Sequence, residues 1–77
     1  MREDFNMISY KKLWETLEER KMSQYDLLKN GVDKRVLDYL RHNKNITLLT
    51  LENICRVVGC KPNDVVEFLD EENIKTL

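Results

Sequence analysis

The feature that most constrains this chain of 77 residues is a helix-start pattern that recurs along it. In this pattern an apolar residue just before the N-cap packs against the fourth helical residue, five positions later. The spacing occurs around five caps: Ser9, Ser23, Asp33, Thr47 and Lys61. The first four caps carry side-chain oxygens that accept hydrogen bonds from first-turn amides, and Lys61 precedes Pro62, which the first helical position tolerates. We therefore expect a chain of short helices.

Apolar side chains follow these starts at helical spacing, for example Tyr10, Leu13 and Leu17. Together with the caps they predict five helices, over residues 10–20, 24–29, 34–41, 48–58 and 62–69. Two glycines and one proline are too few for the turns of an all-β fold. The sequence thus predicts an all-α, five-helix domain without a sheet over residues 8–69, with tails at 1–7 and 70–77.

The composition excludes several classes of protein. Apolar residues make up 42% and charged residues 35% of the chain, and no apolar run exceeds two residues. No segment is therefore suited to cross a bilayer or to form a signal peptide, and we expect a cytoplasmic protein without a membrane partner.

The sequence also contains few residues suited to catalysis or to binding a metal or cofactor. It has a single histidine, no glycine-rich phosphate loop and no nucleophile paired with a base, so we expect no enzyme, no metal site, no cofactor and no small-molecule ligand. A redox or metal protein that uses Cys55 and Cys60 is retained as a third hypothesis.

Charge is distributed unevenly along the chain. Residues 20–44 hold seven basic and three acidic residues, whereas the segments on either side are net acidic. A basic middle indicates a face that meets an anion such as DNA, although an ordinary solvated surface explains the same charges.

The most informative stretch is residues 23–40. A two-turn helix ends at Asn30-Gly31, Val32 follows, and Asp33 starts the next helix at once. Two short helices joined by a three-residue turn with a glycine form the helix-turn-helix pattern. The second helix is predicted to expose cations at its N-terminal end, which suits the major groove of DNA.

At this point the sequence resembles the Cro and phage-repressor type helix-turn-helix family, also called Xre-like regulators, and within it a compact single-domain bacterial subgroup. The residues that carry the resemblance over 8–69 include Met22-Ser23-Gln24, Leu27, Gly31-Val32-Asp33, Val36-Leu37 and Leu40. The resemblance implies five helices around one core, with the second and third forming the DNA-binding unit. It further implies a bacterial or phage transcriptional regulator whose partner is double-stranded DNA.

The chain departs from the family pattern at three places. One residue fewer separates Gln24 from Gly31, and Leu28 stands where the family prefers a small residue. The shorter turn rotates the end of the first motif helix by about 100°, which we expect to swing Leu28 into the core. Asn43 replaces a glycine after the second motif helix, and we expect it to adopt the left-handed conformation.

We expect phosphate contacts at the start of the first motif helix and base contacts from the second. Ser23 and Gln24 are assigned to phosphate, although Gln24 also fits an ordinary exposed first-turn position. Arg35 is suited to pair with a guanine edge, and Lys34 reaches a base or a phosphate. Surface charge for solubility is the alternative explanation of both cations, but cations at a helix N-terminus oppose the helix dipole, which favours a functional role.

The remaining candidate contacts have structural explanations beside the functional ones. Asp33 fits a helix cap, and Asp38 fits either a cytosine contact or repulsion of other sequences. Tyr39 fits a thymine methyl or sugar contact, or a shield for the core. The loop after the second motif helix supplies three further candidates for the DNA backbone, Arg41, Asn43 and Lys44.

Two functions are compatible with these residues. The first is a sequence-specific DNA-binding transcriptional regulator, for which a homodimer on a two-fold site is a candidate, with Leu69, Ile74 and Leu77 as candidate dimer contacts. The second is a protein-interaction module of the same fold, of antitoxin or anti-repressor type, which uses its acidic C-terminal half and does not read DNA.

Overall fold

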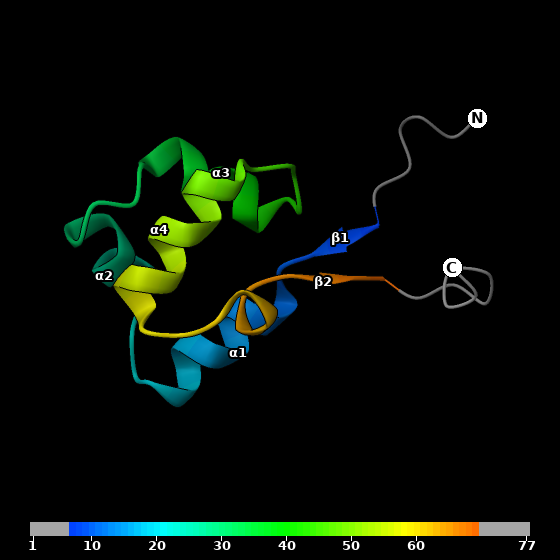
Figure 1. Cartoon of the computed structure of the whole chain (residues 1–77). Coiled ribbons are helices and arrows are strands. Elements are labelled where there is room, and N and C mark those ends of the chain that lie inside the picture. Colours follow the sequence, from blue (N-terminus) through cyan, green and yellow to red (C-terminus); the bar gives the residue numbers. More distant parts are fainter. Residues whose placement is uncertain (1–6, 70–77) are drawn as a thin grey trace.

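The computed structural model describes residues 7–69, and within them the chain is mostly helical. The elements follow one another as β1 (Ile8–Ser9), α1 (Lys11–Glu19), α2 (Gln24–Lys29), α3 (Lys34–Arg41), α4 (Leu48–Val58), the 3-10 turn η1 (Pro62–Asp64) and β2 (Glu67–Phe68) (Figure 1). The four α-helices lie within one or two residues of their predicted ranges.

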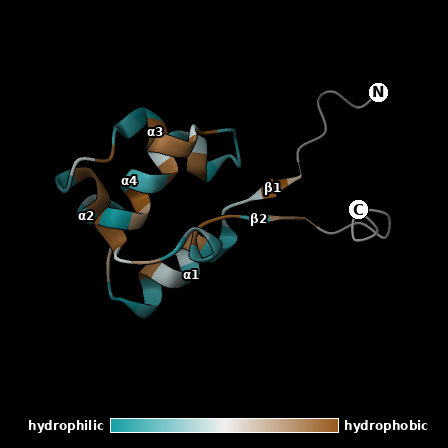
Figure 2. Ribbon diagram, viewed as in Figure 1, coloured by the Kyte–Doolittle hydropathy of each residue, from teal (hydrophilic) through white to brown (hydrophobic). Residues whose placement is uncertain are grey.

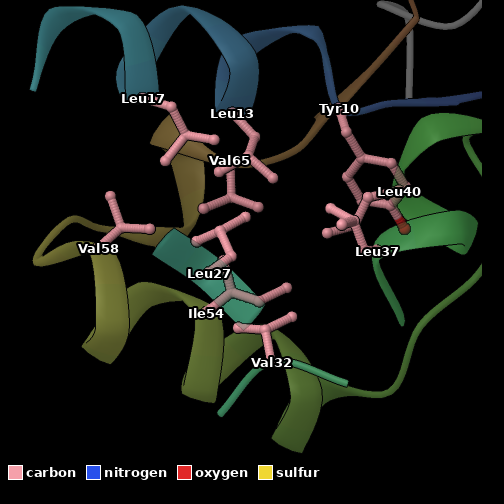
Figure 3. Close-up of a cluster of buried hydrophobic side chains, with 10 residues drawn as sticks. All are labelled: Tyr10, Leu13, Leu17, Leu27, Val32, Leu37, Leu40, Ile54, Val58 and Val65. Carbon is pink, nitrogen blue, oxygen red and sulfur yellow. The ribbon is translucent and has the colours of Figure 1, made fainter. Parts of the chain in front are cut away.

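Each helix carries hydrophobic and hydrophilic residues on different sides, so that one side is available to a shared core (Figure 2). Ten apolar side chains are buried there, and all four helices contribute: Tyr10, Leu13, Leu17, Leu27, Val32, Leu37, Leu40, Ile54, Val58 and Val65 (Figure 3). Burial of each leucine or isoleucine contributes about 1.5–3 kcal/mol, so this cluster is the main stabilising element of the domain.

The predicted fifth helix over residues 62–69, and with it the five-helix count, is wrong. Pro62–Asp64 forms a single 3-10 turn, and Glu67–Phe68 then pairs in antiparallel fashion with Ile8–Ser9. Thr16 Oγ1 donates a hydrogen bond to the carbonyl of Asp64 at 2.9 Å, which anchors the turn on α1. Within the range of the predicted fifth helix, Val65 is buried but Phe68 is 74% exposed.

The prediction that the domain contains no sheet is also wrong. Ile8 and Ser9 read as the start of a helix in the sequence, but they form the strand that pairs with residues 67–68. A further hydrogen bond joins the amide of Leu69 to the carbonyl of Met7, a residue that was assigned to a tail. Residues 1–6 and 70–77 of the predicted tails, including Ile74 and Leu77, lie outside the described part of the chain.

The predicted caps explain where most helices begin. The side chains of Ser23, Asp33 and Thr47 each accept a hydrogen bond from a first-turn amide, as expected for N-caps. Ser9 lies one position too early to be the cap of α1, yet its hydroxyl oxygen still accepts from the amide of Lys11 at 3.2 Å. Local hydrogen bonding therefore fixes these helix starts.

All four α-helices end in a left-handed residue, and the amide of the next residue donates to a carbonyl of the last helical turn. Gly31 has φ 102°, Gly59 has φ 80°, Asn43 has φ 56° and Lys21 has φ 58°. The left-handed conformation predicted for Asn43 is confirmed. Lys21 was not anticipated, because a lysine has a Cβ and pays a steric cost in this region.

Replacing Lys21 with glycine is expected to stabilise the domain by about 0.5–1 kcal/mol, because it relieves the strain at φ 58°. Lys21→Ala, which removes the charge but keeps the Cβ, is expected to leave stability near the wild-type value. Urea denaturation of the two variants measures the difference. A glycine variant no more stable than the alanine variant would show that Lys21 is unstrained.

Candidate nucleic-acid interface

The bihelical unit consists of α2 and α3 joined by Asn30, Gly31, Val32 and Asp33. The amide of Val32 donates to the carbonyl of Leu27 at 2.9 Å, and the amide of Gly31 donates to that of Leu28 at 3.2 Å. This pair of bonds is the Schellman motif, in which the residue after the left-handed glycine packs on the last helical turn. Val32 and Leu27 are both buried, and together they close the corner between the two helices.

Leu28 does not enter the core as the sequence had led us to expect. Its side chain is 36% exposed, whereas the adjacent Leu27 is fully buried. The stop at Gly31 fixes the rotation of α2, and one position along a helix turns a side chain by about 100°. Leu27 therefore points into the core, and Leu28 is carried to the surface.

The exposed face of α3 is largely as predicted. Lys34, Arg35 and Asp38 are exposed and Tyr39 is half-buried, while Leu37 and Leu40 are buried on the opposite side. No ion pair within residues 7–69 engages either Lys34 or Arg35. Cations at a helix N-terminus oppose the helix dipole, so local stability does not explain these two residues.

Asp33 and Asp38 both have structural contacts. Asp33 Oδ1 accepts from the amide of Arg35 at 3.4 Å, which is the predicted cap. The carboxylate of Asp38 lies 3.5 Å from His42 Nδ1, and both side chains are more than half exposed. The contact with His42 was not foreseen, although a spacing of four residues on a helix permits it.

A complete capping box fixes the start of α2. Ser23 Oγ accepts from the amide of Asp26 at 3.1 Å, and Asp26 Oδ2 accepts from the amide of Ser23 at 2.8 Å. The hydrogen bond from the Ser23 backbone, followed by that from its side chain, holds the pKa of the Asp26 carboxyl below its usual value. Helix geometry leaves the amides of Gln24 and Tyr25 without intrahelical acceptors, and these are the donors available to an anion.

A contact between Gln24 and Arg41 links the start of α2 to the end of α3. Gln24 Oε1 accepts from Arg41 Nε at 2.9 Å and from Arg41 Nη2 at 2.7 Å. Both donors meet the same oxygen, so the amide nitrogen of Gln24 is directed away from the arginine. The sequence predicted a separate role for each residue and missed the contact, because nothing local relates positions 17 apart.

The loop after α3 is attached to the first residues of the domain. Asn43 Oδ1 accepts from the amide of Tyr10 at 3.0 Å, and the Tyr10 hydroxyl donates to the carbonyl of Lys44 at 2.6 Å. Burial of the ring raises the pKa of Tyr10 above its usual value. Asn43 thus positions the loop through both its backbone conformation and its side chain, while the side chain of Lys44 is exposed.

Cys55 lies in the last turn of α4 and Cys60 follows the end of this helix; both are half-buried and free. Burial raises the pKa of Cys55 and raises that of Cys60 to about 11. Both thiols are therefore protonated at neutral pH, and a protonated thiol is a poor nucleophile and a poor metal ligand. Among residues 7–69 no group of three His, Cys, Asp or Glu side chains is placed to hold a metal ion.

No helix in the described range, residues 7–69, is long and apolar enough to span a membrane.

Comparison with known proteins agrees with this architecture. The family model of the Cro/C1-type HTH DNA-binding domain matches residues 12–71. The curated Bacillus subtilis (strain 168) protein named "Uncharacterized HTH-type transcriptional regulator YozG" is 37% identical over 60 residues, which cover 74% of this chain and 71% of the relative.

A solved structure also matches. The crystal structure of the transcriptional regulator VanUg (form II) superposes with a TM-score of 0.75 at 35% identity, over 84% of this chain and 88% of VanUg. The family model spans both helices of the bihelical unit together with the core around them. The chain therefore belongs to the Cro/C1-type helix-turn-helix family of DNA-binding domains.

Proposed function

We propose that this protein regulates transcription by binding specific sequences of double-stranded DNA, with α3 in the major groove and the start of α2 against the phosphate backbone. Membership of this family supports a DNA-binding transcriptional regulator. The proposal adds which residues contact the DNA. The observation that carries the assignment is the exposed pair Lys34 and Arg35 at the first turn of α3. The proposal involves no catalytic residue or cofactor, and it assigns the protein to the cytoplasm, where it binds bacterial or phage DNA.

The base contacts are assigned to the N-terminal half of α3. A guanidinium pairs bidentately with the O6 and N7 atoms of guanine, which makes Arg35 the strongest candidate for direct sequence recognition. Lys34 is assigned to a neighbouring base or phosphate. Asp38 and Tyr39 lie about one turn further along the exposed side and are assigned to the adjacent base pair or sugar.

The phosphate contacts are assigned to two places that flank this face. At the first, the Gln24 side-chain amide and the free amides of the α2 N-terminus, next to Ser23, together form a donor set for one phosphate. At the second, the exposed Lys44 extends from the loop that Asn43 and Tyr10 hold in place. Arg41 acts in this scheme through Gln24, because it holds Oε1 and turns the amide nitrogen outward.

Binding to a labelled DNA duplex at several salt concentrations tests the proposal. The logarithm of the affinity should fall linearly with the logarithm of the salt concentration, with a slope of about −0.9 for each phosphate contact. Trp14, the single tryptophan of the chain, lines the same shallow groove as Gln24 and provides an intrinsic fluorescence signal for the complex. A protein that binds no duplex at low salt would contradict the proposal and favour a protein-interaction module.

Gln24 and Arg41 are expected to behave as one unit. Gln24→Ala and Arg41→Ala should each weaken binding to all duplexes by about tenfold, and the double variant should be little weaker than either single variant. Arg56→Ala is the matched control, since it removes an exposed arginine that pairs with Glu52 on α4 at 3.3 Å. Losses that multiply in the double variant would show that Arg41 contacts DNA independently of Gln24.

A further inference from the structure

The end of α3 carries the single histidine of the chain, in contact with an acidic residue of the face that is proposed to read DNA. His42 is the C-cap of α3, and Asp38 lies one turn earlier on the same helix. Both side chains are exposed, His42 by 61% and Asp38 by 58%. A histidine at this place is of interest because imidazole is the side chain that changes its charge at physiological pH.

The contacts of His42 determine which ring nitrogen carries the hydrogen when the ring is neutral. Nδ1 lies 2.9 Å from the backbone carbonyl oxygen of Asp38 and 3.5 Å from the carboxylate of the same residue. A carbonyl and a carboxylate only accept hydrogen bonds, so Nδ1 is the donor and carries the hydrogen. Nε2 is therefore the nitrogen that gains or loses a proton, and no contact within residues 7–69 occupies it.

We propose that protonation of His42 at Nε2 strengthens DNA binding, so that the protein binds its DNA site more tightly in mildly acidic than in mildly alkaline solution. The inference rests on the proposed function and adds its regulation by pH. The protonated ring pairs with Asp38 through Nδ1 and presents a charged N–H group at Nε2 to the DNA backbone. The neutral ring presents only a lone pair there, which a phosphate does not bind.

The direction of the effect follows from thermodynamic linkage. The phosphates of DNA create a negative potential, which favours the charged form of an imidazole near them. Protonation must then favour DNA binding by the same factor, because the two equilibria are reciprocal. The gain is complete below the pKa of the free imidazole and is lost as the pH rises through the higher pKa in the complex. An ordinary imidazole titrates near pH 6.5, so we expect the affinity to fall between about pH 6 and pH 8.

The carboxylate of Asp38 gives the proton a second effect. It lies on the exposed side of α3, where an unpaired negative charge repels the phosphates of an approaching duplex. The charged ring of His42, 3.5 Å away, compensates for this charge. The negative end of the helix dipole also favours a cation at the last turn of α3, so the charged ring is compatible with the fold. Protonation thus removes a repulsion as well as adding a donor.

The other groups near this end of α3 supply no competing titration. Arg41 and Lys44 flank His42 in the chain, and arginine and lysine side chains stay cationic at neutral pH. On the side of β1, Tyr10 donates to the carbonyl of Lys44, and burial raises the pKa of its hydroxyl. On the side of α2, the neutral Gln24 contacts Arg41, and the first turn of α4 holds no charged residue. A change of affinity near neutral pH therefore reports on His42.

Two substitutions of His42 test the proposal, with binding to a labelled duplex measured at pH values of about 6 and 8. An opposite charge raises an imidazole pKa by at least about one, so the wild type should bind about fivefold more tightly at the lower pH. His42→Asn keeps a donor for the carbonyl of Asp38 and lacks the outer nitrogen, so its affinity should be equal at both pH values. His42→Lys carries a permanent charge and should bind at both pH values about as tightly as the wild type does at the lower one.

The salt dependence of binding is a second readout, which a merely structural role of His42 would not change. The slope for the wild type should be steeper at the lower pH by up to about 0.9, the value for one phosphate contact, and that for His42→Asn should be the same at both pH values. Urea denaturation of each protein at both pH values controls for folding. A wild type whose affinity follows the fraction of folded protein, or an equal effect of pH on the wild type and His42→Asn, overturns the proposal. Binding of the wild type that does not depend on pH overturns this role of His42 alone, whereas no duplex binding at either pH overturns the proposed function with it.

Discussion

Replacing Leu27 with alanine should lower the free energy of unfolding by about 3–5 kcal/mol, whereas Leu28→Ala should lower it by less than about 1 kcal/mol. Leu27 is fully buried at the corner between α2 and α3, and its truncation leaves a cavity beside Val32. Leu28 is 36% exposed and loses little contact on truncation. Urea denaturation followed by Trp14 fluorescence measures both values under identical conditions.

The size of the Leu27 effect decides whether the bihelical unit survives. Small domains are stable by only about 5–15 kcal/mol, so this loss removes a large part of the total. Leu27 and Leu28 are consecutive residues of the same type, so each substitution serves as the control for the other. A larger loss for Leu28→Ala than for Leu27→Ala would mean that α2 is rotated and that Leu28 fills the helix crossing.

Arg35→Ala should weaken binding to a preferred DNA sequence by about ten- to a hundredfold and relax the preference at one base pair. The side chain lies exposed at the first turn of α3, where a bidentate contact with guanine contributes to discrimination as well as affinity. Competition assays with duplexes that differ at a single base pair measure this loss of preference.

Lys44→Ala is the control for a cation that contacts only the DNA backbone. It should weaken all duplexes alike and reduce the slope of the salt dependence by about one. If Arg35→Ala and Lys44→Ala reduce affinity in the same sequence-independent way, the assignment of Arg35 to a base is wrong.

Local signals explain why four of the helices could be predicted from the sequence. Ser23, Asp33 and Thr47 each accept a hydrogen bond from an amide two or three residues away, so a short stretch of sequence is enough to predict their role as caps. The left-handed conformation of Asn43 was predictable because few residue types tolerate it. By contrast, Lys21 adopts the same conformation against its own preference, and no local pattern indicates this.

Non-local contacts account for what the sequence did not reveal. Residues 67–68 become a strand because residues 8–9 are available to pair with them, across almost the full length of the domain. The contact between Gln24 and Arg41 likewise joins two polar residues that share no motif. Of the candidate interface, the exposed face of α3 followed from helical periodicity, whereas the links between Gln24 and Arg41 and between Asn43 and Tyr10 required the three-dimensional structure.

The central claim is that the N-terminal half of α3 reads bases in the major groove. Its most direct test is selection of bound sequences from a random pool of duplex DNA, carried out in parallel with the wild type and with Arg35→Ala. The wild type should converge on a motif that contains a guanine, and the Arg35→Ala pool should lose the preference at that position while the rest of the motif persists. A wild-type pool without any enriched motif, or the same motif with both proteins, would contradict the claim.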